Sequence, residues 1–195
     1  LAAAEYFGGG IEKLTYELYE AMNWKWFTNP VTKHPYLACY PEDLPKNVPH
    51  GINEEGMFGG WSAYSEHIFL YILAAGAPRK EFSTGADSYY AMKTYKGSYK
   101  GETFIFCGSG AAFTYQWTHA FIDFRNLRDK LNRNWFDNSR HAGLAARQYA
   151  IDNAHRIKGL GPNSWGMSAC ISPSTGYSGL YGSHPIGVGH KLLEV

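Results

Sequence analysis

The sequence has no excess of one charge, no long apolar run and few cysteines. Charged residues make up 18% of its 195 residues, and the net charge is +1. Nucleic-acid-binding domains carry a basic patch or stripe, so we expect no nucleic-acid partner. A membrane-spanning helix needs about 20 predominantly apolar residues in a row, so we expect no membrane span.

The three cysteines, Cys39, Cys107 and Cys170, lie far apart and lack CxxC spacing. This spacing argues against a zinc site and against a full disulfide framework, and it leaves room for one disulfide at most. We therefore expect no metal and no cofactor. We also expect a periplasmic or secreted location, while a cytoplasmic one stays open.

Aromatic residues, by contrast, are abundant. They make up 16% of a chain that is 45% hydrophobic and long enough to bury a sizeable core. This composition predicts one globular domain over residues 1–195. The first ten residues, LAAAEYFGGG, resemble the middle of a helix followed by a glycine cap. We therefore expect the N-terminal portion of the domain to be missing here and supplied by another segment or chain.

One carboxylate stands out in residues 61–76, WSAYSEHIFLYILAAG. The apolar spacing predicts an α-helix in which Glu66 is the only acidic residue. Burial disfavours the charged form and raises the pKa of a glutamate above its ordinary value of about 4.3. A carboxylic acid that keeps its proton near neutral pH can protonate a leaving group. The alternative is a buried structural glutamate whose oxygens accept hydrogen bonds.

A second aromatic run, residues 112–131, also predicts a helix. Such a helix would place Gln116, His119 and Asp123 on one face, because His119 and Asp123 follow Gln116 by three and seven residues. His119 and Asp123 could then contact each other, which would orient the imidazole or keep the carboxylate ionised. The alternative is an ordinary buried hydrogen-bond network.

A third helix is predicted over residues 141–151, with Asn138 or Ser139 as its N-cap. Arg140 would lie in its first turn, where a guanidinium can clamp a carboxylate or bind sugar hydroxyls. The alternative is a salt bridge to Asp137 or Asp123.

The rest of the chain predicts short elements and long loops. We expect an amphipathic helix over 11–23, a polar helix over 83–95 and a small hairpin within 99–108. Residues 23–61 are rich in Pro, Gly and Asn and predict a long ordered loop or a short hairpin, and the Gly-, Ser- and Pro-rich residues 159–190 predict a loop. The six tryptophans fall mainly at helix ends and in loops, where an indole offers a sugar ring a flat face and one N–H donor.

Four segments in order resemble the glucoamylase-like bacterial family of endo-β-1,2-glucanases and cyclic β-1,2-glucan synthases. They are YSEHIFLYILAAGAP, FTYQWTHAFIDFRNLRD, NWFDNSRHAGLAARQYAIDN, and NSWGMSAC followed by GY. The resemblance implies an all-α fold, an α/α toroid of paired helices with a central active site. This chain would be its C-terminal part, with long loops and a small β-hairpin.

The resemblance also assigns roles to residues. It implies that Glu66 is the general acid, and Asp123 or a carboxylate upstream is the base. The predicted substrate-binding residues are Trp61, Tyr64, Gln116, His119, Arg125, Asn138, Arg140 and Trp165. The chain departs from the family pattern at Ser65, Phe121, Asp137, Met167 and Ser168. Together these departures leave the glucan linkage open.

The resulting hypothesis is a glycoside hydrolase whose substrate is an oligo- or polysaccharide. It would cleave a β-linked glucan, with β-1,2-glucan favoured, by inverting acid/base catalysis. The alternative is a non-catalytic glycan-binding or glucan-synthase-associated domain. A metal site built from Glu66, His119 and Asp123 is a poorer hypothesis, because one histidine and scattered acids make a weak ligand set. A purely structural role would require Glu66 and Asp123 to be paired with arginines away from any cavity.

Overall fold

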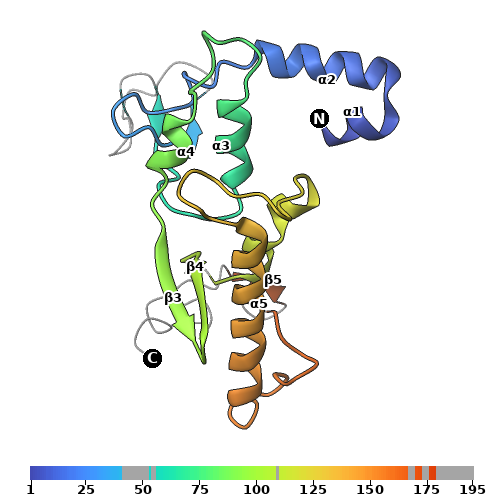
Figure 1. Ribbon diagram of the computed structural model, residues 1–195, viewed down its shortest axis with the longest axis vertical. Helices are drawn as coiled ribbons and strands as arrows, with labels where there is room; N and C mark the ends of the chain where they lie inside the picture. Colours follow the sequence, from blue (N-terminus) through green and yellow to red (C-terminus); the bar gives the residue numbers. More distant parts are fainter. Residues whose placement is uncertain (41–52, 54–55, 109, 167–169, 173–175, 179–195) are drawn as a thin grey trace. The chain divides into compact units, whose positions relative to one another are not determined.

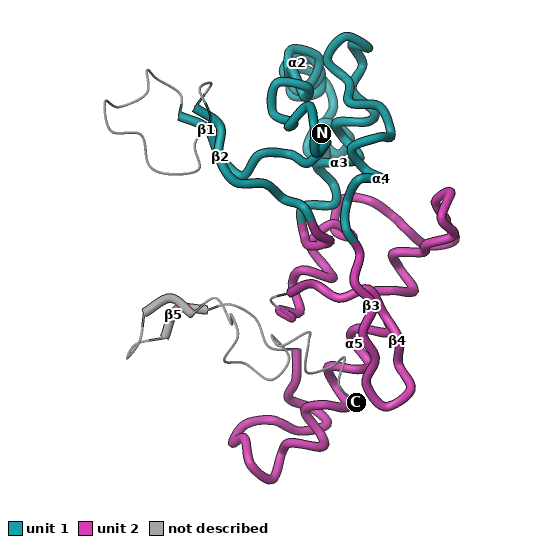
Figure 2. Tube along the Cα trace, turned by 90° about the vertical axis from the view of Figure 1, so that its left-hand side faces the viewer, with its two compact units in different colours: residues 1–62, 67–93 teal, residues 63–66, 94–195 magenta. Residues whose placement is uncertain are grey.

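The computed structural model describes residues 1–40, 53, 56–108, 110–166, 170–172 and 176–178. The chain forms two compact units, drawn in different colours in Figure 2. Unit 1 comprises residues 1–62 and 67–93, and unit 2 comprises residues 63–66 and 94–195. The short segment 63–66, which contains Glu66, therefore belongs to unit 2. Whether the two units make up one domain stays a prediction.

Unit 1 contains four α-helices and one two-stranded antiparallel sheet among its described residues. The elements are α1 (Ala2–Phe7), α2 (Gly9–Ala21), β1 (Ala38–Cys39), β2 (Met57–Phe58), α3 (Ile68–Ala75) and α4 (Asp87–Ala91). The predicted helix over 11–23 is confirmed as α2. The polar helix predicted over 83–95 is shorter, since only α4 is helical there.

The core of unit 1 lies around α3, on which Tyr71 is fully buried. Trp24 packs with Ala74 of the same helix, and the Tyr19 hydroxyl donates to the Leu73 carbonyl over 2.7 Å. Helix α2 contributes little else to this core, because it has no buried residue and leaves its apolar side chains, such as Leu18, exposed.

The prediction of a helix over all of residues 61–76 is wrong in its first half, because α3 begins only at Ile68. Backbone hydrogen bonds within unit 1 hold the preceding residues in another conformation. Trp61 N donates to the Pro35 carbonyl over 2.9 Å, and Lys93 N donates to the Ser62 carbonyl over 2.7 Å. Tertiary pairing thus overrides the apolar periodicity, and Glu66 lies in the turn before the helix.

Unit 2 is built on a hairpin and a long helix, which lie side by side in Figure 1. Its elements are β3 (Tyr95–Tyr99), β4 (Glu102–Phe106), the 3₁₀ helices η1 (Ala112–Tyr115) and η2 (Trp117–Ala120), α5 (Trp135–Asp152), β5 (Cys170–Ser172) and β6 (Gly176–Ser178). Strands β3 and β4 pair from Tyr95↔Phe106 to Tyr99↔Glu102. Lys100 and Gly101 form the turn with positive φ, as a two-residue type I′ hairpin requires. The predicted hairpin is confirmed.

Helix α5 begins earlier than predicted. Its N-cap is Asn134, whose side chain accepts from the Asp137 N–H over 3.0 Å, and not Asn138 or Ser139. Asn138 lies one turn inside the helix, where its side chain accepts from Ile105 N over 2.6 Å and donates to Ile105 O over 3.1 Å. The Asn138 carboxamide therefore forms the two hydrogen bonds with β4 that a neighbouring strand would otherwise form.

The long helix predicted over 112–131 is also wrong. Only η1 and η2 form, and hydrogen bonds between residues three apart, such as His119 N to Gln116 O at 3.0 Å, replace the α-helical pattern. Positive φ at Asn126 and Asn132 then keeps the chain in turns. Local turn chemistry has overridden the aromatic spacing.

The fold-class prediction is confirmed in part. The described residues hold five α-helices, two 3₁₀ helices and three two-stranded antiparallel sheets, so there is more strand than the single hairpin of an all-α prediction. These elements do not by themselves establish an α/α toroid. No helix among the described residues is both long enough and apolar enough to cross a membrane.

Candidate functional site

Glu66 lies half-buried in the turn that immediately precedes α3. The hydroxyl of Ser65 donates to its carboxylate. The Thr118 hydroxyl, from η2, donates to the Glu66 carbonyl over 2.8 Å. Two contacts from unit 2 therefore hold both the main chain and the side chain of this residue, which gives a carboxyl group a defined position.

Tyr64 is almost fully buried beside this turn. Its ring stacks on Trp135 with centroids 4.7 Å apart and planes 4° apart. Burial raises the pKa of its hydroxyl far above the usual value, while hydrogen bonds with Ser139 and Asn138 lower it in part. The negative charge of Glu66 is a smaller cause that also raises this pKa. The phenol therefore stays protonated and acts as a hydrogen-bond donor or acceptor.

His119 joins the same group through Ser139. Its Nε2 lies 2.8 Å from the Ser139 hydroxyl, and its ring packs edge-on against Phe124 with centroids 5.0 Å apart. Burial lowers the pKa of His119, and the nearby Asp123 raises it to a lesser extent. The imidazole is therefore neutral near pH 7. We call Tyr64, Ser65, Glu66, His119 and Ser139 the Glu66 cluster.

Asp123 has different surroundings, since its side chain is 59% exposed. Both of its oxygens accept from Arg125, with Oδ1 2.9 Å from Nε and Oδ2 2.7 Å from Nη2. The Arg125 side-chain hydrogen bonds are the main cause that lowers the pKa of Asp123 to about 2. The predicted electrostatic contact with His119 is present but is a minor contribution. Asp123 is thus ionised at neutral pH and held in a bidentate pair, which makes it a weak base.

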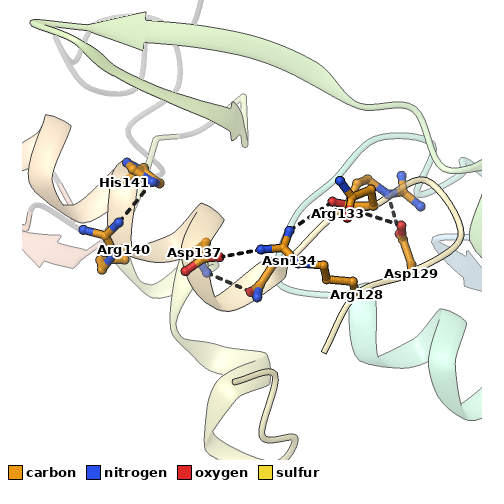
Figure 3. Close-up of polar contacts among 8 residues, drawn as sticks. Arg128, Asp129, Arg133, Asn134, Asp137, Arg140 and His141 are labelled. Carbon is orange, nitrogen blue, oxygen red and sulfur yellow. Dashed lines mark hydrogen bonds and ion pairs between the residues drawn. The ribbon is translucent and has the colours of Figure 1, made fainter. Parts of the chain in front are cut away.

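The N-terminal end of α5 is a network of polar contacts, shown in Figure 3. Arg128 pairs with Asp137 over 3.5 Å, and Arg133 pairs with Asp129 over 2.5 Å. Arg140 therefore forms neither of the two salt bridges suggested for it, because Asp137 and Asp123 each pair with another arginine.

Arg140 instead donates to the neighbouring His141. Its Nη2 lies 3.2 Å from Nε2 of the imidazole. A guanidinium can only donate, so Nε2 must accept, which puts the ring proton on Nδ1. That N–H donates to Glu102 of β4. Glu102 and His141 therefore orient Arg140.

A cavity of about 320 Å³ lies along α5 in unit 2, and we call it the α5 cavity. Three residues predicted to bind substrate line it, namely Gln116, Arg140 and Trp165. It adjoins the Glu66 cluster, because its lining includes Ser139 and also Cys107, whose Sγ lies 3.5 Å from the Ser65 hydroxyl. Glu66 and Asp123 are not among the lining residues.

Three other residues predicted to bind substrate, Asn138, Arg125 and Trp61, contact protein groups in this structure. The Asn138 carboxamide pairs with the Ile105 backbone, and Arg125 pairs with Asp123. Trp61 belongs to unit 1, where its ring lies on His67 with centroids 4.5 Å apart. Substrate contacts for all three stay predictions.

The described part of the chain contains no group of three or more His, Cys, Asp and Glu side chains that could hold a metal ion. Glu66, His119 and Asp123 therefore do not form a metal-binding set here.

Sequence reasoning did not find several residues that build the site. Ser139 was predicted only as a possible N-cap, although it links His119 to Tyr64. Thr118 gave no signal, because its contact with Glu66 spans 52 residues.

Comparison with known proteins identifies the relatives. Residues 59–189 match a family model described as "Putative glucoamylase". No curated protein matches the chain. Similar solved structures include a putative glucoamylase from Bacteroides caccae (23% identity, TM-score 0.68, covering 91% of this chain and 44% of that one) and one from Bacteroides uniformis (21%, 0.70, 91% and 43%).

A β-1,2-glucanase from Parabacteroides distasonis is also similar, at 18% identity and a TM-score of 0.64 over 91% of this chain and 28% of that one. This chain spans less than half the length of each of these three solved chains. The family match covers most of the chain, including the Glu66 turn, the His119 segment and α5. The chain therefore belongs to the glucoamylase-like family that this model describes.

Proposed function

We propose that this protein is a glycoside hydrolase that cleaves a β-linked glucan, with β-1,2-glucan as the favoured substrate. The observation that carries the proposal is the held position of Glu66 in a cluster of polar residues that adjoins the α5 cavity through Ser139. Glu66 supplies the proton for the glycosidic oxygen, and the buried hydroxyl of Tyr64 is a donor beside it. The family membership and the similarity to a β-1,2-glucanase support the same reaction.

Inverting hydrolysis needs a second carboxylate that activates water on the other side of the sugar ring. Asp123 is the predicted residue, but its pairing with Arg125 makes it a weak base. We therefore propose that the base is Asp123 or a carboxylate upstream. We also propose that the whole protein has an α/α toroid fold. Its favoured location is the periplasm or outside the cell.

The Asp123–Arg125 pair also favours a second candidate. A domain that binds a glycan without cleaving it needs no free catalytic base. The ion pair between Asp123 and Arg125 would therefore not impair its function. In that case the α5 cavity would hold a glycan, or serve a larger glucan synthase, and Glu66 would be a structural acid.

Hydrolysis separates these functions. The whole protein should be incubated with linear β-1,2-glucan, with other β- and α-glucans as controls, and the products followed by proton NMR. We expect cleavage of β-1,2-glucan with the opposite anomeric configuration in the first product. Binding without cleavage of any glucan would support the second candidate.

A further inference from the structure

Two hydrogen bonds in series lead from the end of strand β4 to the carboxyl group of Glu66. Cys107 directly follows the last residue of β4, and its thiol is buried. The thiol donates to the Ser65 hydroxyl over 3.5 Å, and the Ser65 hydroxyl donates to Oε2 of Glu66. Ser65 is also buried, so bulk water does not compete for these bonds. The series therefore ends on one particular oxygen of the carboxyl group.

The number of protons on each group fixes the direction of the two bonds. A serine hydroxyl has one proton, whereas an ionised carboxylate has none and can only accept. The Ser65 proton points to Oε2, which leaves the Ser65 oxygen to accept from Cys107. When Glu66 carries the proton of a general acid, Oε2 stays an acceptor only if that proton is on Oε1. The two oxygens of the carboxyl group are therefore not equivalent.

The reverse arrangement would hold back the acid proton. A hydroxyl both donates and accepts, so Ser65 could turn and accept the proton of the Glu66 carboxyl group. That proton would then point at Ser65 and not at a glycosidic oxygen. In this arrangement Ser65 would have to turn its own proton toward Cys107, whose sulfur is a weak acceptor. The thiol therefore favours Ser65 as a donor to Glu66.

The backbone of Cys107 is held on both sides. Its N–H donates to the Tyr115 hydroxyl over 2.8 Å, and its carbonyl accepts from Gly110 N over 3.0 Å. Tyr115 is itself buried, and its ring lies edge-on to Phe104 of β4 with centroids 6.3 Å apart. This fixed backbone gives the thiol a defined position beside Ser65.

We propose that Ser65 and Cys107 are positioning residues for the general acid and that they keep its proton on Oε1 of Glu66. This inference rests on the hydrolase function proposed above. Ser65 orients the acid directly, and Cys107 acts through Ser65. The proton on Oε1 is then available to the glycosidic oxygen of a bound glucan.

The test compares two substrates of the whole protein, one whose leaving group needs a proton and one whose leaving group does not. They are linear β-1,2-glucan and a dinitrophenyl β-glucoside oligosaccharide. We expect Ser65→Ala to lower kcat on the glucan roughly tenfold and Cys107→Ala about threefold, because a thiol is the weaker donor. Both variants should keep KM and their activity on the aryl substrate near wild type. Cys39→Ala, at a half-buried cysteine of unit 1, is the matched control and should change neither activity.

A third variant separates donation by the thiol from packing. Cys107→Ser keeps a donor, whereas Cys107→Ala keeps an apolar side chain. If Cys107 acts as a donor, serine should restore most of the kcat on glucan that alanine loses. If Cys107 only fills space in the core, serine should be the worse variant, because it buries a polar hydroxyl. The thermal unfolding midpoint and the activity on the aryl substrate show whether each variant folds.

A double variant tests whether Cys107 acts through Ser65. In the Ser65→Ala background, Cys107→Ala should cause no further loss of kcat on the glucan, because its partner is already gone. Losses that multiply in the double variant would overturn the positioning role. Losses of equal size on the glucan and the aryl substrate would also overturn it, because the two residues would then support the fold and not proton donation.

The outcomes keep the positioning role separate from the hydrolase function. Cleavage of the glucan by the wild-type protein with unchanged kcat in Ser65→Ala and Cys107→Ala refutes the positioning role alone. Cleavage of neither substrate, nor of any other glucan, by the wild-type protein refutes the hydrolase function and the positioning role with it.

Discussion

Two turns of unit 2 carry the two carboxylates predicted to be catalytic, and their surroundings differ. Glu66 is half-buried, and its turn accepts hydrogen bonds from Ser65 and Thr118. Asp123 is mostly exposed and paired at both oxygens with Arg125. Among the described residues, the one side-chain donor to the Glu66 carboxylate is the neutral hydroxyl of Ser65, whereas the guanidinium paired with Asp123 is positively charged and keeps that carboxylate ionised. The same residue class thus has different chemistry in the two turns.

Removing each carboxylate gives the largest expected effect. Glu66→Gln should lower kcat/KM on β-1,2-glucan by about 10²- to 10⁴-fold, the usual contribution of a general acid or base. Asp123→Asn should lower kcat/KM by a smaller factor than Glu66→Gln, because the pairing with Arg125 already makes Asp123 a weak base. Steady-state kinetics of the whole protein measures both. Equal losses would show that Asp123 is a full catalytic partner despite its ion pair.

The contact that holds the Glu66 turn should have a smaller effect. Thr118→Val keeps the shape of the side chain but removes the donor to the Glu66 carbonyl. We expect a loss of about 1 kcal/mol in unfolding free energy and a several-fold fall in kcat, because the acid is less well positioned. Thr103→Val on the exposed side of β4 is the control, and it should change neither. A kcat equal to wild type would show that Thr118 does not position Glu66.

The smallest effect concerns the protonation of Asp123. Arg125→Met removes the main cause of its low pKa, so we expect this pKa to rise from about 2 toward its ordinary value of about 3.9. NMR titration of the Asp123 carboxyl carbon measures it, and Arg128→Met is the control. An unchanged pKa in Arg125→Met would show that another group holds the carboxylate ionised.

The ion pair between Asp123 and Arg125 also determines how the stability of the fold changes with pH. The folded pKa of Asp123 is below its unfolded value, so the ion pair stabilises the fold above about pH 4. That contribution is lost as the pH falls toward 2. It should be small, because both side chains are exposed and solvent screens them.

Local patterns predicted the elements whose stability is local. Helix α2, helix α5 and the hairpin were found because periodicity and turn residues determine them over short stretches. The helices over 61–76 and 112–131 were overpredicted for a physical reason. Ser62 and Thr118 form hydrogen bonds with residues far along the chain, and such pairing has no signature in a single sequence.

In the candidate site, too, local patterns could be predicted from the sequence, whereas contacts between distant residues could not. The family resemblance and the isolation of Glu66 in an apolar run singled out this residue, but they did not predict that it lies in a turn before the helix. The pairing of Asp123 with Arg125 follows from residues only two positions apart, but a helical interpretation placed them on different faces. The role of Ser139 as a link depends on packing between α5 and the His119 segment, which no local pattern encodes.

The most direct test of Glu66 as the acid compares two leaving groups. A dinitrophenyl β-glucoside oligosaccharide has a leaving group that departs without a proton, whereas a glucan needs one. We expect Glu66→Ala in the whole protein to lose most of its kcat/KM on β-1,2-glucan but to keep activity near wild type on the aryl substrate. An equal loss on both substrates would contradict this expectation, because Glu66 would then serve binding or structure and not proton donation.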